Sequence, residues 1–370
     1  MSIIDPTDVD ELAAFYTYLA EAEFDGYCDL YATLAREIVA DRELLEVLAG
    51  LAPSTKIVPV LTFAAVHHLL LAEPDQPLAR IYATGEGDPW PPFRDLLTTR
   101  LDDIAHLMAV RSVQTNEVGR AAVIAPALAA VHERFGRPLA LVEIGTSAGL
   151  NLLLDRFGYR YDLPDGTTVR RGDLASPVQL ACEVRGDLLP SLPPTLPPMA
   201  SRTGIDLHPV DVHEAEERRW LEACVWPRVP DRPERLRAAI ELARAERPEL
   251  RTGDALELLD PTIATIDEDA VPVVLSTWVL GYFSRESRAA LGELLDGIGA
   301  ERDLAFVSGE YPSIAPFVAK PERVAHGTDG GGASLVGLSS WQGGGRRSDP
   351  VAWIHAHGRW IDWLDAETAG

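Results

Sequence analysis

Apolar residues recur at every third or fourth position through the first 135 residues, a spacing that predicts helices with one buried face. The segments with this spacing are 8–22, 28–41, 42–52, 57–73, 93–110 and 117–135. Prolines separate several of them, most densely in the sequence DPWPP at 88–92. No convincing pair of strands precedes residue 138. We therefore expect an all-helical N-terminal domain over residues 1–135.

The hydrophobic period changes after Pro138. LALVEI (139–144) is a short, nearly all-apolar run, as expected for a parallel strand that is covered on both faces, and GLNLLLDRF (149–157) predicts a helix. Further strands are expected within 200–210, 250–259, 271–284 and 304–312, with helices at 234–246 and 284–298. Strands alternating with helices predict an α/β fold, a Rossmann-like, doubly wound and mostly parallel sheet, over residues 136–370.

Two other segments add to this predicted domain. An insertion at about 158–200 contains YRYDLPDGTTVRRGD and a proline-rich piece, which together predict a small hairpin and an extended arm. Near the end of the chain, the apolar segments 332–342 and 351–364 flank the sequence GGGRR. This arrangement predicts a C-terminal antiparallel hairpin.

Composition narrows the classes of function. The net charge of −24 argues against a nucleic-acid partner, because a phosphate backbone requires a basic surface. No apolar run is long enough to cross a bilayer, and the first residues lack the features of a signal peptide. The three cysteines are far apart in the sequence, which favours reduced thiols. We expect a cytoplasmic protein that acts on a small molecule and has no membrane partner. The oligomeric state stays open.

The sequence that follows the first predicted strand fits two chemistries. GTSAG (145–149) matches the G-x-S-x-G elbow of serine hydrolases, with Ser147 as the nucleophile. Counted from Glu143, it is also one residue away from the E-x-G-x-G-x-G loop with which methyltransferases hold S-adenosylmethionine. A hydrolase elbow follows several strands and an oxyanion-hole segment of the H-G-G-G type, and neither precedes residue 139 here. A serine hydrolase or esterase is the alternative hypothesis.

The next two predicted strands favour nucleotide binding. A second strand in such a domain ends in an acidic residue that accepts hydrogen bonds from the ribose hydroxyls, and Asp206 in GIDLHP has that position. If the 158–200 segment is not an insertion, Asp162 takes this role instead. Gly253 and Asp254 follow the third strand, where the adenine edge is expected.

Sequence motifs along the chain also carry a family resemblance. They are RSVQTNEVGR (111–120), EIGTSAGLNLLLDRFGYRYD (143–162), GIDLHPVDV (204–212), VWP (225–227), GD (253–254) and HAHGRW (355–360). On these motifs the chain is identified as a member of an uncharacterised family, domain of unknown function 2332. Residues 138–370 resemble a class I S-adenosylmethionine-dependent methyltransferase.

The methyltransferase resemblance implies S-adenosylmethionine as cofactor and methyl transfer to an oxygen or nitrogen nucleophile. The cofactor loop would comprise Gly145, Thr146, Ser147, Gly149 and Asn151. Ser147 replaces the usual middle glycine. A non-catalytic domain that binds a nucleoside or a protein partner is a further alternative.

Other polar residues are candidates for the site. Glu143, in an apolar strand, is expected to cap the N–H groups of the loop and to reach the amino end of the cofactor, or only to brace the loop. The polar cluster Gln114, Asn116 and Glu117, with Arg111 beside it, either binds substrate or holds a helix N-cap at Thr115 or Asn116.

Three residues lie at or just beyond the carboxyl ends of the fourth and fifth predicted strands, where open α/β sheets bind ligands. Trp278 and Tyr282 are expected to wall the methyl-transfer site or to pack in the core, and Glu310 to take a proton from the acceptor. His355 and His357 form an H-x-H pair in a predicted strand, but no third ligand is placed by spacing, so we predict no metal site.

Overall fold

The computed structural model describes residues 7–51, 58–314, 316–327 and 333–364. Backbone contacts divide the chain into two units: Met1–Thr115 with Val212–Arg237, and Asn116–Asp211 with Ala238–Gly370. The predicted boundary between residues 135 and 136 lies inside the second unit, because the helix that ends at residue 135 belongs to it. Residue 1, where the first predicted domain starts, and residue 370, where the second ends, lie outside the described residues. So do the end of the predicted helix 42–52 and the start of the predicted helix 57–73.

The first unit is helical, as predicted, and no strand precedes residue 139 in the described part of the chain. Its elements are α1 (Val9–Tyr18), the π-helical turn η1 (Leu19–Phe24), α2 (Asp29–Ala40), α3 (Arg42–Leu51), α4 (Val58–Ala72), α5 (Pro77–Thr84), α6 (Trp90–Thr99), α7 (Leu101–Val110) and α9 (Ala215–Ala223). The helix α10 (Arg232–Glu246) crosses from this unit into the other. No helix in the described ranges is long and apolar enough to cross a membrane.

Two details of the first unit differ from the prediction. The segment 93–110 forms two helices, not one, because the chain leaves helical geometry at Arg100 after Thr98 and Thr99, whose hydroxyls bond back to carbonyls one turn earlier. The helix α5 was not predicted, although it begins at Pro77 and ends before Gly85 in the left-handed conformation, both common helix boundaries.

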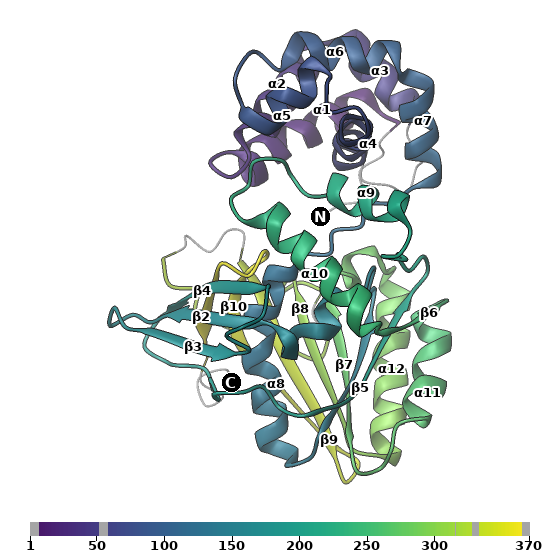
Figure 1. Ribbon diagram of the computed structural model, residues 1–370. Helices are drawn as coiled ribbons and strands as arrows, with labels where there is room; N and C mark the ends of the chain where they lie inside the picture. Colours follow the sequence, from purple (N-terminus) through teal and green to yellow (C-terminus); the bar gives the residue numbers. More distant parts are fainter. Residues whose placement is uncertain (1–6, 52–57, 315, 328–332, 365–370) are drawn as a thin grey trace. The chain divides into compact units, whose positions relative to one another are not determined.

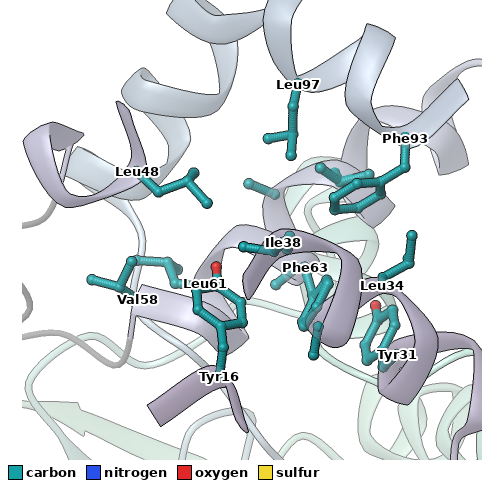
Figure 2. Close-up of a cluster of buried hydrophobic side chains, with 14 of the residues drawn as sticks. Tyr16, Tyr31, Leu34, Ile38, Leu48, Val58, Leu61, Phe63, Phe93 and Leu97 are labelled. Carbon is teal, nitrogen blue, oxygen red and sulfur yellow. The ribbon is translucent and has the colours of Figure 1, made fainter. Parts of the chain in front are cut away.

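Helix α4 lies at the centre of this unit. Its own side chains are apolar on every face, as is typical of a helix that is buried all round. Figure 2 shows Phe63 projecting from it among aromatic side chains of neighbouring helices. The Phe63 ring stacks on Tyr31 with ring centroids 4.4 Å apart, and it meets Tyr16 and Phe24 edge-on at 6.1 and 5.9 Å. Such close aromatic pairs add to the burial that holds these helices together.

The second unit is built on one large mixed sheet (Figure 1). Its strands are β1 (Leu139–Ile144), β2 (Gly158–Asp162), β3 (Thr168–Gly172), β4 (Gln179–Arg185), β5 (Met199–Asp206), β6 (Glu249–Thr252), β7 (Val271–Thr277), β8 (Leu304–Glu310), β9 (Ala333–Gln342), β10 (Gly345–His355) and β11 (Trp360–Trp363). They lie in the order β3-β2-β4-β11-β10-β9-β8-β7-β1-β5-β6. The strands β6, β5, β1, β7 and β8 are all parallel, and β9 and β10 are antiparallel to their neighbours.

Helices cover both faces of the central strands. Helix α8 (Ala121–Phe135) contacts β8 and β9, whereas α11 (Ala255–Ala264) contacts β1 and β5, and α12 (Arg285–Glu301) contacts β9 and β10. Figure 1 shows α8 on one face of the sheet and α11 with α12 on the other. Every residue of β1, β7 and β8 is consequently buried, which explains their almost entirely apolar sequences.

The C-terminal hairpin is confirmed, with one correction. Strands β9 and β10 pair antiparallel around Gly343 and Gly344, both with positive φ, as tight hairpin turns require. The segment 351–364 is not one strand, because the chain turns at Gly358 (φ +73°) between β10 and β11. His355 therefore ends a strand and His357 lies in a turn.

Two predictions between the first strands need correction. The segment 149–157 forms only a short 3₁₀ helix, η3 (Leu150–Arg156), because its leucines are buried on every side and the chain enters β2 at once. The 158–200 insertion holds the predicted hairpin, β2 and β3, but it also adds β4. Strand β4 pairs with β2 and β11 and so joins the insertion to the main sheet.

A proline inside α8 generates a stability prediction. Pro126 has no N–H group to donate to the carbonyl of Ala122, and the buried Tyr161 hydroxyl from β2 donates to that oxygen instead at 2.8 Å. Tyr161→Phe should lower the free energy of unfolding by about 1 kcal/mol. In a Pro126→Ala background the new backbone N–H can donate to the carbonyl of Ala122. Tyr161→Phe should therefore lower the free energy of unfolding by less in that background. Urea denaturation of the four proteins measures this coupling; equal costs in both backgrounds would contradict it.

Candidate functional site

The glycine loop after β1 has an unusual backbone. Gly145, Ser147 and Gly149 all have positive φ, of 67°, 53° and 69°. A Cβ on Gly145 would lie 2.2 Å from Cγ2 of Val279, so glycine is required there by packing as well as by conformation. Ser147 is the exception, since a non-glycine residue in this region is strained by roughly 1–2 kcal/mol.

The end of β5 holds this loop in place. The N–H groups of Gly145 and Thr146 donate to the carbonyl of Ile205, and the N–H of Ser147 donates to Oδ2 of Asp206 at 2.8 Å. Oδ1 of Asp206 accepts the N–H of His208 at 2.9 Å. The carboxylate of Asp206 thus ties the β1 loop to the β5 loop, in addition to any ligand it binds.

Asp206 ends the strand that pairs with β1, whereas Asp162 does not. Asp162 ends β2, and β4, β11, β10, β9, β8 and β7 stand between β2 and β1 in the sheet. The carboxylate of Asp162 pairs with Arg160 and accepts the hydroxyl of Thr168. Of the two candidates, only Asp206 lies beside the glycine loop.

Gly253 and Asp254 follow β6, the neighbour of β5. Gly253 has a φ of 153°. The side chain of Asp254 accepts the N–H of Leu256 at 2.8 Å and is the N-cap of α11. This cap accounts for the residue type at position 254 without a ligand.

Glu143 is buried near the end of β1 and is 2% exposed. Its Oε2 accepts the hydroxyl of Thr146 at 2.7 Å. We expected it to cap the N–H groups of the loop, but those of Gly145 and Thr146 go to Ile205. Burial raises the pKa of Glu143 to about 8, while the hydroxyl of Thr146 and the charge of Arg120 act in the opposite direction.

Glu310, the last residue of β8, is completely buried. Its Oε1 accepts the hydroxyl of Ser276 at 2.7 Å and the N–H groups of Val279 and Leu280 at 3.1 and 3.2 Å. Its Oε2 is buried with no hydrogen-bond partner in the described part of the chain. Burial raises the pKa of Glu310, against these hydrogen bonds and the charge of Arg120.

Trp278 directly follows β7 and has a left-handed backbone, with φ of 55°. Its N–H donates to the carbonyl of Gly309 at 3.0 Å, while its indole Nε1 is buried without a described partner. Tyr282, in the 3₁₀ turn η4 (Leu280–Tyr282), is 65% exposed and is not part of this buried group. Strained non-glycine residues thus follow two adjacent strands, β1 and β7, and such strain is common at functional sites.

Arg120 is a residue that sequence analysis did not single out. It ends the 3₁₀ turn η2 (Val118–Arg120) and is 7% exposed. Its guanidinium donates to the carbonyls of Thr277 and Ala356 at 3.3 and 3.1 Å and lies 4.2 Å from the ring centroid of Trp278. The only sequence signal for its burial is the apolar helix that follows it.

The predicted substrate residues are divided between the two units. Arg111 and Gln114 belong to the first, where Arg111 pairs with Glu217 at 2.5 Å and the backbone N–H of Gln114 donates to Sγ of Cys224.

Asn116 and Glu117 belong to the second unit. Asn116 donates from Nδ2 to the carbonyl of Thr146 at 3.0 Å, so it braces the glycine loop. The alternative interpretation of this cluster, an N-cap at Thr115 or Asn116, is not what the structure has: Glu117 is the N-cap of η2 and accepts the N–H of Gly119.

Comparison with known proteins adds a family to this geometry. Residues 13–363 match the family described as "Uncharacterized protein conserved in bacteria (DUF2332)". The chain belongs to this family. No curated protein matches the chain. Membership in DUF2332 assigns no reaction, so the function must be inferred from the site itself.

The burial of Glu143 predicts a pH effect on stability. Between about pH 4.5 and about pH 8 the unfolded chain ionises this residue and the folded protein keeps it protonated, so the residue lowers stability as pH rises through this window. Glu143→Gln removes that contribution. The unfolding free energy of the variant minus that of wild type should therefore increase from pH 5 to pH 8.

Chemical denaturation at several pH values measures this difference. The surface variant Glu241→Gln, at a carboxylate that pairs with Arg244, is the matched control. A difference that is constant with pH would show that Glu143 is ionised in the folded protein.

Proposed function

We propose that the second unit is a Rossmann-like domain that binds S-adenosylmethionine and transfers its methyl group to a small molecule. The observation that carries this proposal is the position of the strained glycine loop beside Asp206, at the tips of the adjacent strands β1 and β5. The strand order β6-β5-β1-β7-β8 corresponds to the order 3-2-1-4-5 of nucleotide-binding folds. In such sheets ligands bind where the order reverses, which here is between β1 and β7.

Polar atoms at these strand ends support a bound ligand. Several of the buried side-chain atoms that lack hydrogen-bond partners among the described residues lie at or just after the ends of β1, β7 and β8: Ser147 Oγ, Asn151 Oδ1, Trp278 Nε1 and Glu310 Oε2. A buried polar atom without a partner costs about 1–3 kcal/mol, so a polar ligand that supplied partners would bind favourably. The residues therefore fit a cofactor with amino, carboxylate and ribose groups.

Each group of the cofactor has residues that would hold it. The loop from Gly145 to Gly149, with Asn151 and Glu143, would hold the methionine part. Asp206 would accept the ribose hydroxyls, and Asp254 would lie at the adenine edge. When bound, S-adenosylmethionine supplies an electrophilic methyl group.

The residues of the chain contribute orientation and a dry environment. Glu310 Oε2, completely buried, would accept a hydrogen bond from the O–H or N–H of the acceptor and so direct its lone pair. The ring of Trp278 would exclude water beside it. Orientation of two bound reactants supplies most of the catalysis in transfers of this kind.

The serine hydrolase remains a second hypothesis because Ser147 has the strained backbone of a nucleophile elbow. A nucleophilic serine also needs a base within hydrogen-bond reach. In the described residues the Ser147 hydroxyl has no hydrogen-bond partner, histidine included. The first strand of the sheet also precedes this loop directly, as the methyltransferase proposal requires.

Cofactor binding tests the proposal. Wild-type protein should bind S-adenosylmethionine and its demethylated product in calorimetry. Asp206→Asn should weaken both at least about tenfold, because a charged acceptor for the ribose hydroxyls is lost. Asp162→Asn is the matched control and should bind as wild type. No binding to wild type, or equal binding by Asp206→Asn, would contradict the proposal.

Ser147 separates the two hypotheses. Ser147→Gly removes a left-handed serine, so it should preserve cofactor binding and raise the thermal midpoint slightly. Wild type should not react with a fluorophosphonate probe, as read by intact-protein mass spectrometry. Stoichiometric labelling of wild type that is lost in Ser147→Gly would instead establish a serine hydrolase.

A further inference from the structure

Two motifs that the proposed function leaves unexplained meet in the second unit. Residues 117–120, before α8, and residues 355–358, at the end of β10 and in the turn that follows, are separated by more than 230 positions in the sequence. Three contacts join them. Arg120 Nε donates to the carbonyl of Ala356 at 3.1 Å, and Gly358 packs so closely that a Cβ there would lie 1.9 Å from the carbonyl oxygen of Gly119.

The third contact is between two titratable side chains. Oε2 of Glu117 lies 3.7 Å from Nδ1 of His357. Glu117 is 3% exposed, and its other oxygen, Oε1, accepts the N–H of Gly119 at 2.9 Å, which fixes the carboxylate. At 3.7 Å the two atoms are within ion-pair distance but beyond hydrogen-bond distance, and catalytic contacts that are long in a ligand-free protein often shorten when substrate binds.

The hydrogen bonds of the turn assign the protons on its two histidines. The backbone N–H of His357 donates to Nδ1 of His355 at 3.0 Å. Nδ1 of His355 is therefore an acceptor, and a neutral His355 ring carries its proton on Nε2. An ionised Glu117 can only accept, so it favours the proton of His357 on Nδ1. The lone pair of the His357 ring is then on Nε2.

We propose that His357 is a proton-accepting residue of this site and that Glu117 is its positioning residue. The inference rests on the proposed function in that the proton comes from the methyl acceptor. The O–H or N–H bond of the methyl acceptor breaks, and its proton binds the lone pair on Nε2 of His357. The electron pair of that bond stays on the oxygen or nitrogen of the acceptor. The resulting imidazolium keeps its Nδ1–H toward the carboxylate of Glu117, which stabilises the charge.

Charged and titratable groups of two segments face the ring of His357. From η2 and the residue before it, the Glu117 carboxylate favours the protonated ring and the Arg120 guanidinium opposes it. From its own turn, His355 contributes a ring whose centroid lies 5.6 Å away. Glu310 is the other candidate base, but its Oε1 already serves three donors and it lies fully buried.

Nuclear magnetic resonance of protein labelled with ¹⁵N in histidine tests the pair. His357 is assigned by loss of its signals in His357→Gln. In wild type its neutral form should carry the proton on Nδ1, and that of His355 on Nε2. In Glu117→Gln the midpoint of the His357 titration should fall by about one pH unit, and Glu117→Asp should restore part of it. The opposite tautomer, or an unchanged midpoint in Glu117→Gln, would overturn the proposal.

Reactivity shows whether Nε2 can be reached. Diethyl pyrocarbonate, followed by peptide mass spectrometry, should modify His357 faster than His355, whose Nε2 is protonated, and Glu117→Gln should slow the modification of His357. An unreactive His357 in wild type would overturn the proposal, because a base that no reagent reaches cannot take a proton from a substrate.

Calorimetry separates this proposal from the proposed function. His357→Gln should bind S-adenosylmethionine as wild type does, because the residue acts on the acceptor and not on the cofactor. Absence of cofactor binding in wild type would overturn the proposed function alone, and the tautomer and reactivity of His357 would still decide the proposal made here.

Discussion

The guanidinium of Arg120 is the contact on which the strand ends of the second unit depend. It joins the end of β7 to the turn after β10 through two carbonyls, and it covers the ring of Trp278. Its charge also lowers the pKa of both buried glutamates, Glu143 and Glu310, against the effect of burial. A buried charge is tolerated when its hydrogen bonds are satisfied, and the carbonyls of Thr277 and Ala356 accept hydrogen bonds from this guanidinium.

The protonation of these groups follows from that balance. Because the pKa of Glu143 is about 8, this residue is mostly protonated at neutral pH and holds Thr146 without adding a negative charge. The site therefore contains the guanidinium of Arg120 and the carboxyl group of Glu143. A cation that approached Glu143 would favour its ionised form. A ligand with positive charge would gain from that response, and S-adenosylmethionine is such a ligand.

Sequence patterns correctly predicted the elements whose burial leaves a local signal in the chain. LALVEI was identified as the first strand because both of its faces are covered, and Asp206 was placed at a strand tip because polar sequence follows an apolar run. The separation of β4 from its partner β11 by about 180 residues leaves no local signal, so the extension of the sheet was missed. The partners of Arg120 are backbone carbonyls, which have no sequence signature.

A local sequence pattern gave a wrong prediction where one glycine determines the path of the backbone. The apolar segment 351–364 was expected to form one side of the hairpin, but Gly358 packs against Gly119 and the chain reverses there. As a result His355 and His357 do not share one face of a strand, which was the basis for considering a metal. In the turn they differ in their partners: Nδ1 of His355 accepts the N–H of His357, whereas Nδ1 of His357 lies 3.7 Å from Oε2 of Glu117, which is the basis for the different tautomers proposed for them.

The same G-x-S-x-G sequence can present its serine in two ways, and the surrounding hydrogen bonds distinguish them. In a hydrolase the oxyanion is bound by the N–H of the residue after the nucleophile, which here would be Ala148, and by an N–H from a loop after an earlier strand. Here the N–H groups of Gly145, Thr146 and Ser147 are all bound to the end of β5, and β1 is the first strand. The strain at Ser147 therefore fixes the loop against Asp206, at the place where a ribose would bind. This arrangement is the one that the proposed nucleotide-type ligand requires.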